Sequence, residues 1–326
     1  MLFRLVFIPA ILLLHACGQG TEPRFFQHGM DTGSRPWTHT SFSETNDDFT
    51  FAVIGDLTGG ERKGIYSTAV EQLNHLDPAF VVSVGDLIEG GTNNRDTLQN
   101  QWESFDSRTR HLEMPFFYLG GNHDLTNPVM RQVWKERYGA TYYYFLYRNV
   151  LFLMLDSEDF EEQKLLEINR EREKAMKIIR GEAPGVFEET PYAQMKESRT
   201  GAISQQQTEY FKKVLDSFPD PRWTFVFMHK PLWERDDEKG LGSLEQALAS
   251  RNYTVINGHL HSYSHRVRNE KDYYVMGTTG GYQNPADSMA FDHLTLVRMK
   301  EKPLLTPLKM NGILHENGVA PEILRN

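Results

Sequence analysis

The chain has 326 residues, of which 39% are hydrophobic and 24% charged, and its 35 Lys and Arg against 44 Asp and Glu give a net charge of −9. This apolar content predicts one large globular domain or two small ones, and it excludes a disordered or fibrous protein. An acidic chain without a sustained run of Lys and Arg lacks the charge that neutralises nucleic-acid phosphates, so nucleic acid is disfavoured as a partner. The single cysteine, Cys17, excludes an intramolecular disulfide and a cysteine-based zinc site.

The first residues have the pattern of an export signal. Arg4 precedes an apolar run over residues 5–14. Ten apolar residues are far fewer than the roughly 20 that cross a bilayer, which favours a cleaved signal peptide of residues 1–16 over a permanent transmembrane helix. The sequence LHAC at residues 14–17 resembles a bacterial lipobox. That resemblance implies a lipid on Cys17, a membrane partner and an extracytoplasmic location facing the periplasm or the cell exterior; a plain secreted protein is the alternative.

Composition divides the remainder of the chain. Residues 17–48 hold Gly, Thr, Ser, Pro, Asn and Asp without apolar periodicity, which predicts a flexible, lipid-anchored linker. Residues 49–300 alternate apolar runs with helical patterns and predict one domain, followed by a C-terminal tail at 301–326. Inside the domain, residues 157–200 are rich in Glu, Lys and Arg, which predicts a solvated insertion with charged surface helices.

Strands and helices alternate from residue 49 onward. Apolar residues at helical spacing predict a helix over 65–76, a second after the N-cap Asn127, and a third at the capping box of residues 204–207. A repeated order of strand, polar cluster and helix indicates an α/β layered architecture, in which ligands collect beyond the carboxyl ends of the strands. Apolar runs predict strands at 51–54, 80–84, 114–119, 223–228, 254–257, 273–276 and 291–299, and a hairpin of 142–147 with 150–155.

Five of the predicted strands end in residues of the types that bind metals. Two divalent cations a few ångströms apart need oxygen and imidazole ligands from several strand ends, and one carboxylate that reaches both. Glycine beside such a ligand lets the backbone approach closely, because it has no Cβ. The clusters are Gly55-Asp56, Gly85-Asp86, Gly121-Asn122-His123-Asp124, His229 and Gly258-His259-Leu260-His261.

Taken together in this order, the clusters resemble the motifs of the calcineurin-like metallophosphoesterase superfamily, and GDLTGG at residues 55–60 resembles a bacterial branch of it. The resemblance covers residues 49 to about 300. It implies a layered β-sandwich of mixed sheets flanked by helices, with the metal site at the carboxyl ends of strands. It also implies two divalent metal ions (Mn, Fe or Zn) and hydrolysis of a small phosphate monoester or diester by in-line attack of a metal-bound hydroxide.

The resemblance further implies a role for each residue of the clusters. His123 resembles the family's catalytic histidine, and Asp124 would orient its ring and raise its pKa. Along an extended segment His259 and His261 would point the same way, because the side-chain period is two. The implied metal ligands are Asp86 as the bridge, Asp56 and His261 at the first metal, and Asn122, His229 and His259 at the second.

Four residues near the motifs have less certain roles. Thr58 stands where most relatives carry a histidine ligand, so the first metal would be held more weakly or would be a harder cation. Glu89 stands where purple acid phosphatases carry a tyrosine, and it could reach the metals or lie in a solvated loop. His265 could touch a metal ligand or lie on the surface. Arg62 could donate to a substrate phosphate or be solvated.

Two other functions stay open on these residues. The substitution at position 58 is compatible with a non-catalytic or single-metal binding lipoprotein on the same scaffold, which would hold at most one metal. A nucleotide or nucleic-acid phosphodiesterase is the second alternative, although the acidic balance disfavours nucleic acid. The aromatic residues that could stack on a base, or else pack in the core or on the surface, are Trp233, Tyr263 and Tyr282.

Overall fold

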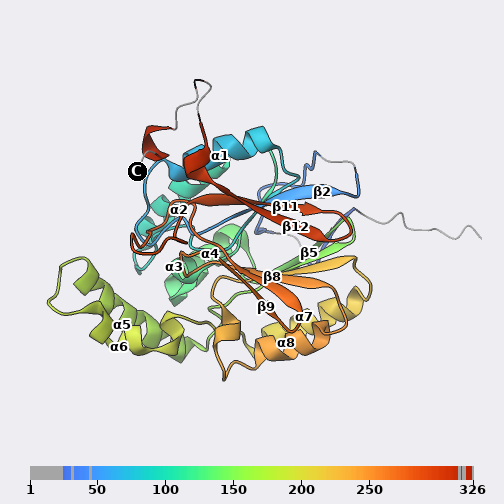
Figure 1. Cartoon of the computed structure of the whole chain (residues 1–326). Helices are drawn as coiled ribbons and strands as arrows, with labels where there is room; N and C mark the ends of the chain where they lie inside the picture. Colours follow the sequence, from blue (N-terminus) through green and yellow to red (C-terminus); the bar gives the residue numbers. More distant parts are fainter. Residues whose placement is uncertain (1–24, 31–32, 44–45, 315–316, 318–320, 325–326) are drawn as a thin grey trace, which may run out of the picture.

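The architecture is a sandwich of two mixed β-sheets with helices on both outer faces (Figure 1). This confirms the predicted α/β layered β-sandwich. Residues 1–16 and Cys17, predicted to be the signal peptide and lipid site, lie outside the described residues. Among the described residues, no helix has the length and apolar character needed to cross a bilayer. The computed structural model describes residues 25–30, 33–43, 46–314, 317 and 321–324.

Each sheet contains a run of parallel strands in the described part of the chain. In the larger sheet β6, β7, β8 and β10 are parallel neighbours, and in the smaller sheet β2, β3 and β4 are parallel. The larger sheet has the order β1 (Phe26–His28), β5 (Tyr143–Tyr147), β6 (Val150–Met154), β7 (Trp223–Phe227), β8 (Tyr253–Asn257), β10 (Lys271–Val275) and β9 (Ser264–Arg268). The smaller sheet has the order β12 (Pro303–Lys309), β11 (His293–Met299), β2 (Phe49–Ile54), β3 (Val81–Ser83) and β4 (Phe116–Phe117).

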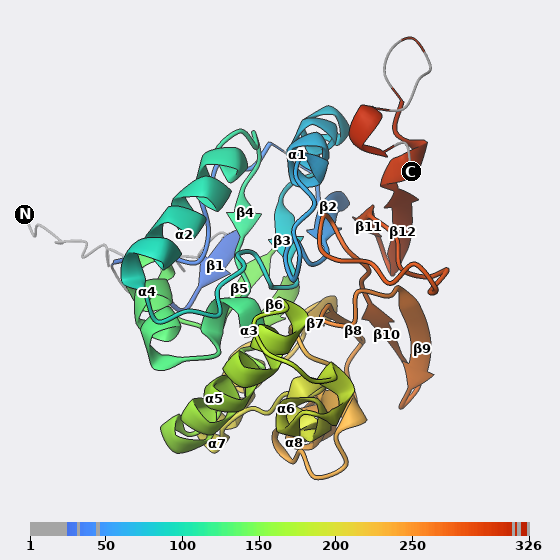
Figure 2. The ribbon, with the colours of Figure 1, turned by 90° about the vertical axis from the view of Figure 1, so that its left-hand side faces the viewer.

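Helices cover each sheet from outside. The smaller sheet is packed against α1 (Ile65–Leu76), α2 (Arg95–Thr109) and α4 (Pro128–Tyr138), and the larger sheet against α7 (Gln205–Ser217) and α8 (Gly240–Leu248). Three more helices, α3 (Asn122–Leu125), α5 (Glu162–Ile179) and α6 (Pro191–Gln194), lie together in front in Figure 2. Short 3₁₀ turns occur at Phe187–Glu189, Lys196–Ser198, Leu232–Glu234, Met310–Gly312 and Glu322–Leu324.

An aromatic core holds the two sheets together. Phe51 of β2 stacks on Phe80 with ring centroids 5.2 Å apart, and its edge meets Phe152 of β6 in the facing sheet at 5.3 Å. Phe152 in turn stacks on Phe145 at 4.5 Å. All four side chains are fully buried. Offset stacks and edge-to-face contacts are the preferred aromatic geometries, so this core fixes how β2 sits over β6.

Local sequence signals correctly locate several elements. Asn127 caps α4 by accepting a hydrogen bond from the amide of Met130 at 2.9 Å, and Ser204 caps α7 by accepting from Gln207 at 3.1 Å. The predicted hairpin is β5–β6, and Arg148 and Asn149 both have left-handed φ angles, 47° and 58°. A two-residue turn with two positive φ angles matches the twist of paired strands.

Two of the predicted boundaries are wrong. The predicted linker, residues 17–48, contains β1, which pairs with β5, and Trp37, which is buried against Phe117. The predicted tail, 301–326, contains β12, which pairs with β11 along its whole length. Both segments escaped prediction because their apolar residues are too irregularly spaced, or too exposed, to show a period.

Candidate metal centre

The candidate ligands follow the parallel strands, at one edge of the sandwich. In the smaller sheet Asp56 follows β2, Asp86 follows β3 and Asn122 begins α3 after β4. From the larger sheet, His229 follows β7, and His259 and His261 follow β8. The carboxyl ends of the two sheets thus face each other across this edge, which is turned toward the viewer in Figure 2. The predicted placement at strand ends is confirmed.

Two groups of side chains lie close enough to bind cations. Asp86, His229 and His259 form one group, and Asp56, Asp86 and His261 form the other. Within each group the ligand atoms all lie within 4.8 Å of one another. Asp86 belongs to both groups, as the sequence predicted for a bridging carboxylate. Asn122, also predicted as a ligand, places its Oδ1 3.2 Å from Nε2 of His229.

Each ligand histidine has one ring nitrogen bonded to a backbone carbonyl. The oxygens that accept these hydrogen bonds belong to Val84, Ser198 and Tyr282. Nδ1 of His229 lies 2.8 Å from the first, Nε2 of His259 lies 2.9 Å from the second, and Nδ1 of His261 lies 2.6 Å from the third. A carbonyl partner fixes the tautomer and leaves the other ring nitrogen free to bind a metal.

The backbone at the ligands is strained in a way that favours a functional site. Asp86, His259 and His261 have left-handed φ angles of 55°, 73° and 53°, which non-glycine residues rarely adopt. The prediction that the two histidines point the same way along an extended segment is therefore wrong, because the backbone turns at each of them. His259 faces the group with His229, and His261 faces the group with Asp56.

Close packing around the carboxylates explains two of the glycines. A Cβ at Gly121 would collide with the Asp86 carboxylate and lie 2.6 Å from the Asp86 amide nitrogen. A Cβ at Gly258 would collide with the Asp56 carboxylate and lie 2.7 Å from Val84. Real Cβ atoms do not approach this closely, so glycine is required where each ligand carboxylate meets the neighbouring loop.

The electrostatics of the site are those of a cation-binding cavity. Burial by itself would lower the pKa of His229, but the Asp86 and Asp56 carboxylates outweigh it and raise the pKa to about 9. Burial would raise the pKa of Asp86, but His229 and His123 hold it well below its usual range. Carboxylate and imidazole donors in this negative environment suit Mn, Fe or Zn, so the residues present fit a divalent cation.

His123 lies beside this centre, with partners other than those predicted. Its Nδ1 lies 2.7 Å from the carbonyl oxygen of Glu89, and its Nε2 accepts a hydrogen bond from Nη2 of Arg172 at 3.0 Å. Burial lowers the pKa of His123; the Asp86 carboxylate opposes this and Arg172 adds to it. The carbonyl of Glu89 therefore fixes the ring, a role that the sequence assigned to Asp124.

Asp124 braces the loops and does not touch His123 within the described residues. Its carboxylate accepts hydrogen bonds from the amides of Gly121 at 2.8 Å, Leu87 at 3.1 Å and Ile88 at 3.2 Å. Burial and the nearby Asp86 raise its pKa to about 8. The prediction that it orients His123 and raises the pKa of His123 is wrong, because its oxygens already bind the amides that hold Asp86 in place.

The four residues with uncertain roles all have structural partners. Thr58 is buried and its hydroxyl can donate to the carbonyl oxygens of Asp86, at 3.1 Å, and Ile88, at 2.9 Å, so it braces the Asp86 loop. Arg62 donates to Asp292 at 2.7 Å and to the carbonyl of Gly281, and it is not among the residues that line the pocket beside the centre. Glu89 Oε1 accepts from the amides of residues 60 and 61, and His265 lies on edge strand β9, 2.8 Å from Asp272.

A pocket of about 810 Å³ adjoins the centre. His123 and His261 form part of its wall, and Arg172, Met176 and Ile179 of α5 form another part. Of the three aromatic residues considered for stacking, only Tyr282 is among its lining residues. Trp233 packs on Tyr273 with centroids 5.0 Å apart and Tyr263 packs on Phe291 at 5.9 Å.

Sequence reasoning missed Arg172, although a signal was present. The solvated insertion, residues 157–200, contains α5, whose buried residues are Leu165, Ile168, Arg172 and Ala175. These positions follow the spacing of an amphipathic helix, so Arg172 stands on the apolar face of a helix that was predicted to be merely charged and exposed. An arginine in that position is the signal that the helix covers something polar.

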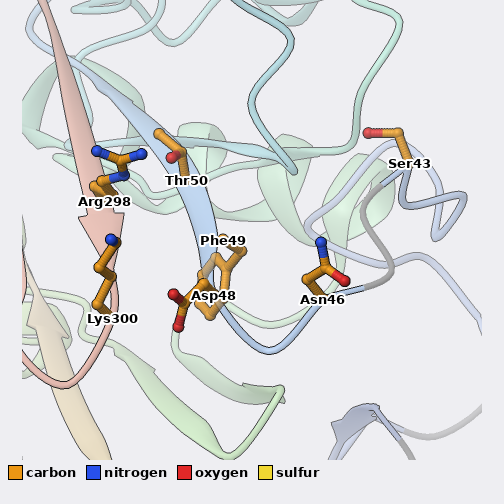
Figure 3. Close-up of a pocket in the computed structure, with 7 residues that line it drawn as sticks. All are labelled: Ser43, Asn46, Asp48, Phe49, Thr50, Arg298 and Lys300. Atoms are coloured by element: carbon orange, nitrogen blue, oxygen red, sulfur yellow. The ribbon is translucent and has the colours of Figure 1, made fainter.

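A second pocket, of about 500 Å³, lies at the opposite end of β2 from Asp56 (Figure 3). Asp48, Phe49, Arg298 and Lys300 are among its lining residues. Phe49 begins β2, whereas Asp56 follows its last residue, so none of the candidate ligands takes part in this pocket. The larger pocket, by contrast, is lined by the candidate ligand His261 and by His123.

A family model described as calcineurin-like phosphoesterase matches residues 49–263. The chain belongs to this family. It is a hydrolase that acts on phosphoester bonds with the help of metal, and the ligand types at its strand ends are those that such a reaction needs. The resemblance of the sequence motifs to this family is therefore confirmed.

Solved structures share the fold at low sequence identity. A dimetal phosphatase from Danio rerio has a TM-score of 0.52 and 14% identity, over 80% of this chain and 96% of that one. A purple acid phosphatase from yellow lupin seeds has a TM-score of 0.51 and 14% identity, over 80% of this chain and 51% of that one. No sequence among the curated proteins matches the phosphoesterase.

Proposed function

We propose that the phosphoesterase is a dinuclear-metal-dependent hydrolase of small phosphate esters. The observation that carries the proposal is Asp86, whose carboxylate belongs to both groups of candidate ligands. Two cations that share a carboxylate sit close enough to bind one phosphate together. Asp56 and His261 would hold one cation, and His229 and His259 the other, with Asn122 beside His229.

In the proposed reaction the cations and His123 would have different roles. When bound, the cations would polarise the phosphate and activate the attacking water. His123 would serve the leaving group, because its Nδ1 is fixed by the Glu89 carbonyl and the residue lines the pocket. When the ring is protonated, Nε2 would give up the hydrogen bond that it accepts from Arg172 and carry the proton for transfer to the departing oxygen. The lowered pKa of His123, caused first by burial, makes the protonated ring a stronger acid.

The test combines metal content with turnover of two substrates. Purified protein of residues 18–326 is analysed for bound metal and assayed on p-nitrophenyl phosphate and bis-p-nitrophenyl phosphate with added Mn²⁺. We expect two metals and turnover, and the ratio of the two rates separates a monoesterase from a diesterase. Asp86→Asn and His123→Gln should each lose turnover by orders of magnitude, whereas His265→Gln, a change on the exposed edge strand, should match the wild type.

Two outcomes would overturn the proposal. Binding of at most one metal, with neither ester hydrolysed, would favour a non-catalytic or single-metal binding protein on the same scaffold. Wild-type activity in Asp86→Asn would refute the shared-carboxylate mechanism even if two metals were present.

We also propose that Cys17 carries a lipid that anchors the phosphoesterase outside the cytoplasm. The support is the apolar run of residues 5–14 followed by LHAC. In bacteria that express the full chain, radiolabelled palmitate should enter the protein, and the protein should sediment with membranes. Cys17→Ser should abolish the labelling and release the protein; membrane association that survives this change would refute the lipid anchor.

A further inference from the structure

Arg172 is a buried cation without an acidic partner. The residue is 6% exposed, and among the described residues no carboxylate lies within 4 Å of its guanidinium. Within the same residues, Nη2 is the guanidinium nitrogen that has a hydrogen-bond partner, and that partner is the ring of His123, with Nε2 at 3.0 Å and Nδ1 at 3.4 Å. Burying a charge is costly unless an opposite charge compensates it, so the site is built for an anion that the chain itself does not provide.

The position of Arg172 shows where such an anion would lie. Arg172 and His123 both line the pocket beside the metal centre, and His261 lines it as well. An anion that contacts all three therefore lies next to the candidate metal ligands, where the phosphate of the substrate is expected. A guanidinium binds phosphate through two parallel N–H groups, and Arg172 has nitrogens to spare for this.

The pocket also has several large apolar side chains in its wall. Met176 and Ile179 stand one turn apart on α5, and Phe187 follows on a 3₁₀ turn of the same insertion. Tyr282 lines the pocket from the loop whose carbonyl holds His261. Ile179 is 58% exposed and Tyr282 is 54% exposed. Large apolar side chains exposed in a concave wall are typical of a surface that a ligand covers.

We infer that the α5 insertion selects a phosphate ester whose organic group is apolar, aromatic or alkyl. Arg172 donates to a phosphate oxygen, and Met176, Ile179, Phe187 and Tyr282 enclose the organic group. The volume of about 810 Å³ lies within the range of sites for small molecules. Glu89, Glu173 and Arg180 also line this pocket. Arg180 is already paired with Glu182, so the charge of the two carboxylates disfavours an anionic organic group such as a second phosphate. The inference rests on the proposed function for the identity of the reacting bond.

The test measures binding of compounds that cannot be hydrolysed. Inorganic phosphate, methylphosphonate and benzylphosphonate are titrated into the Mn²⁺-loaded protein by calorimetry, so that the result does not depend on turnover. Arg172→Gln should weaken all three by roughly 10- to 100-fold, the range for one lost charge-assisted hydrogen bond, and Arg172→Lys should restore part of the loss. Arg170→Gln, which changes an exposed arginine of the same helix, is the matched control.

A second variant tests the apolar side chains of the pocket. Wild type should bind benzylphosphonate on the order of tenfold more tightly than methylphosphonate, as burial of an aromatic ring predicts. Met176→Ser should reduce this ratio and leave the affinity for inorganic phosphate unchanged. Leu166→Ser, a change at a residue of α5 that is 50% exposed and does not line the pocket, should leave both unchanged.

The outcomes separate the inference from the proposed function. Equal affinity of wild type for the two phosphonates, or an Arg172→Gln variant that binds phosphate as Arg170→Gln does, would overturn the inference while leaving ester hydrolysis intact. Selective binding of benzylphosphonate by a protein that hydrolyses neither p-nitrophenyl ester would support the pocket assignment and overturn the proposed function.

Discussion

Replacing Lys230 tests how the insertion is joined to the metal centre. Lys230 follows the candidate ligand His229, and its ammonium lies 2.9 and 3.1 Å from the two carboxylate oxygens of Glu158 and 2.8 Å from the carbonyl oxygen of Glu197. These partners stand near the two ends of the insertion, and both Lys230 and Glu158 are 0% exposed. Lys230→Met leaves the buried carboxylate of Glu158 without a cation, which lowers the free energy of unfolding by about 3–5 kcal/mol.

The assay is thermal unfolding followed by circular dichroism. The loss of stability in Lys230→Met corresponds to a melting temperature lowered by on the order of 10 °C for a domain of this size. Lys196→Met, which breaks a solvent-exposed pair between the same insertion and Asp237, should cost less than about 1 kcal/mol. Lys230→Met combined with Glu158→Leu should regain most of the stability, because no buried charge is then left unpaired.

The pH dependence gives an independent check. Burial raises the pKa of Glu158, and Lys230 opposes this, so Lys230→Met raises that pKa further. A carboxyl whose pKa is higher in the folded state destabilises the fold above its unfolded pKa, and the penalty fades as pH falls. The difference in melting temperature between variant and wild type should therefore shrink from pH 8 to pH 5. A difference of less than 2 °C at pH 8, or one that grows on acidification, would refute the reasoning.

Three further predictions concern the centre itself. Because the pKa of His229 is about 9, a cation that binds to it at pH 7 must displace its proton; calorimetry in buffers of different ionisation enthalpy should detect proton release, and an absence of release would refute His229 as a ligand. Asp86→Ala should lower the metal content from two to none, whereas Asp56→Ala should leave one, as measured by elemental analysis; equal losses would contradict the shared carboxylate. Arg62→Ala should keep kcat/KM within about threefold of wild type, because Arg62 is bound to Asp292, and a larger loss would restore it as a substrate contact.

The sequence was sufficient to place the ligand atoms at the strand ends. Asp56 and Asp86 directly follow apolar strands, and parallel strands bring their carboxyl ends to one edge, so residue type and position were enough. The partners of His123 and Asp124 were not predictable in this way. Adjacent residues on the short helix α3 point in different directions, and which loop each meets depends on tertiary packing.

Arg172 illustrates a different limit. Its place on the apolar face of α5 was readable from spacing, but nothing in the spacing says which surface α5 covers. Likewise β1 has three residues and, in the part of the chain that the structure describes, pairs with β5 alone, so its stability comes from the sheet it joins and leaves no local pattern. Local sequence patterns therefore predict helices and strands, whereas the role of a side chain depends on contacts between distant segments.

The insertion is therefore a component of the centre, although its composition suggested a solvated appendage. The carbonyl of Ser198, in this insertion, accepts the hydrogen bond that orients His259. The direction of a candidate ligand is thus set by a backbone atom, which a sequence motif does not show. In the same insertion, Glu158 neutralises Lys230 beside His229, and Arg172 reaches His123. Ligand orientation, local charge and the pocket wall thus depend on one segment. Changes in that segment can alter substrate choice. The metal centre stays intact only if they preserve the hydrogen bond from His259 to Ser198 and the ion pair of Glu158 with Lys230.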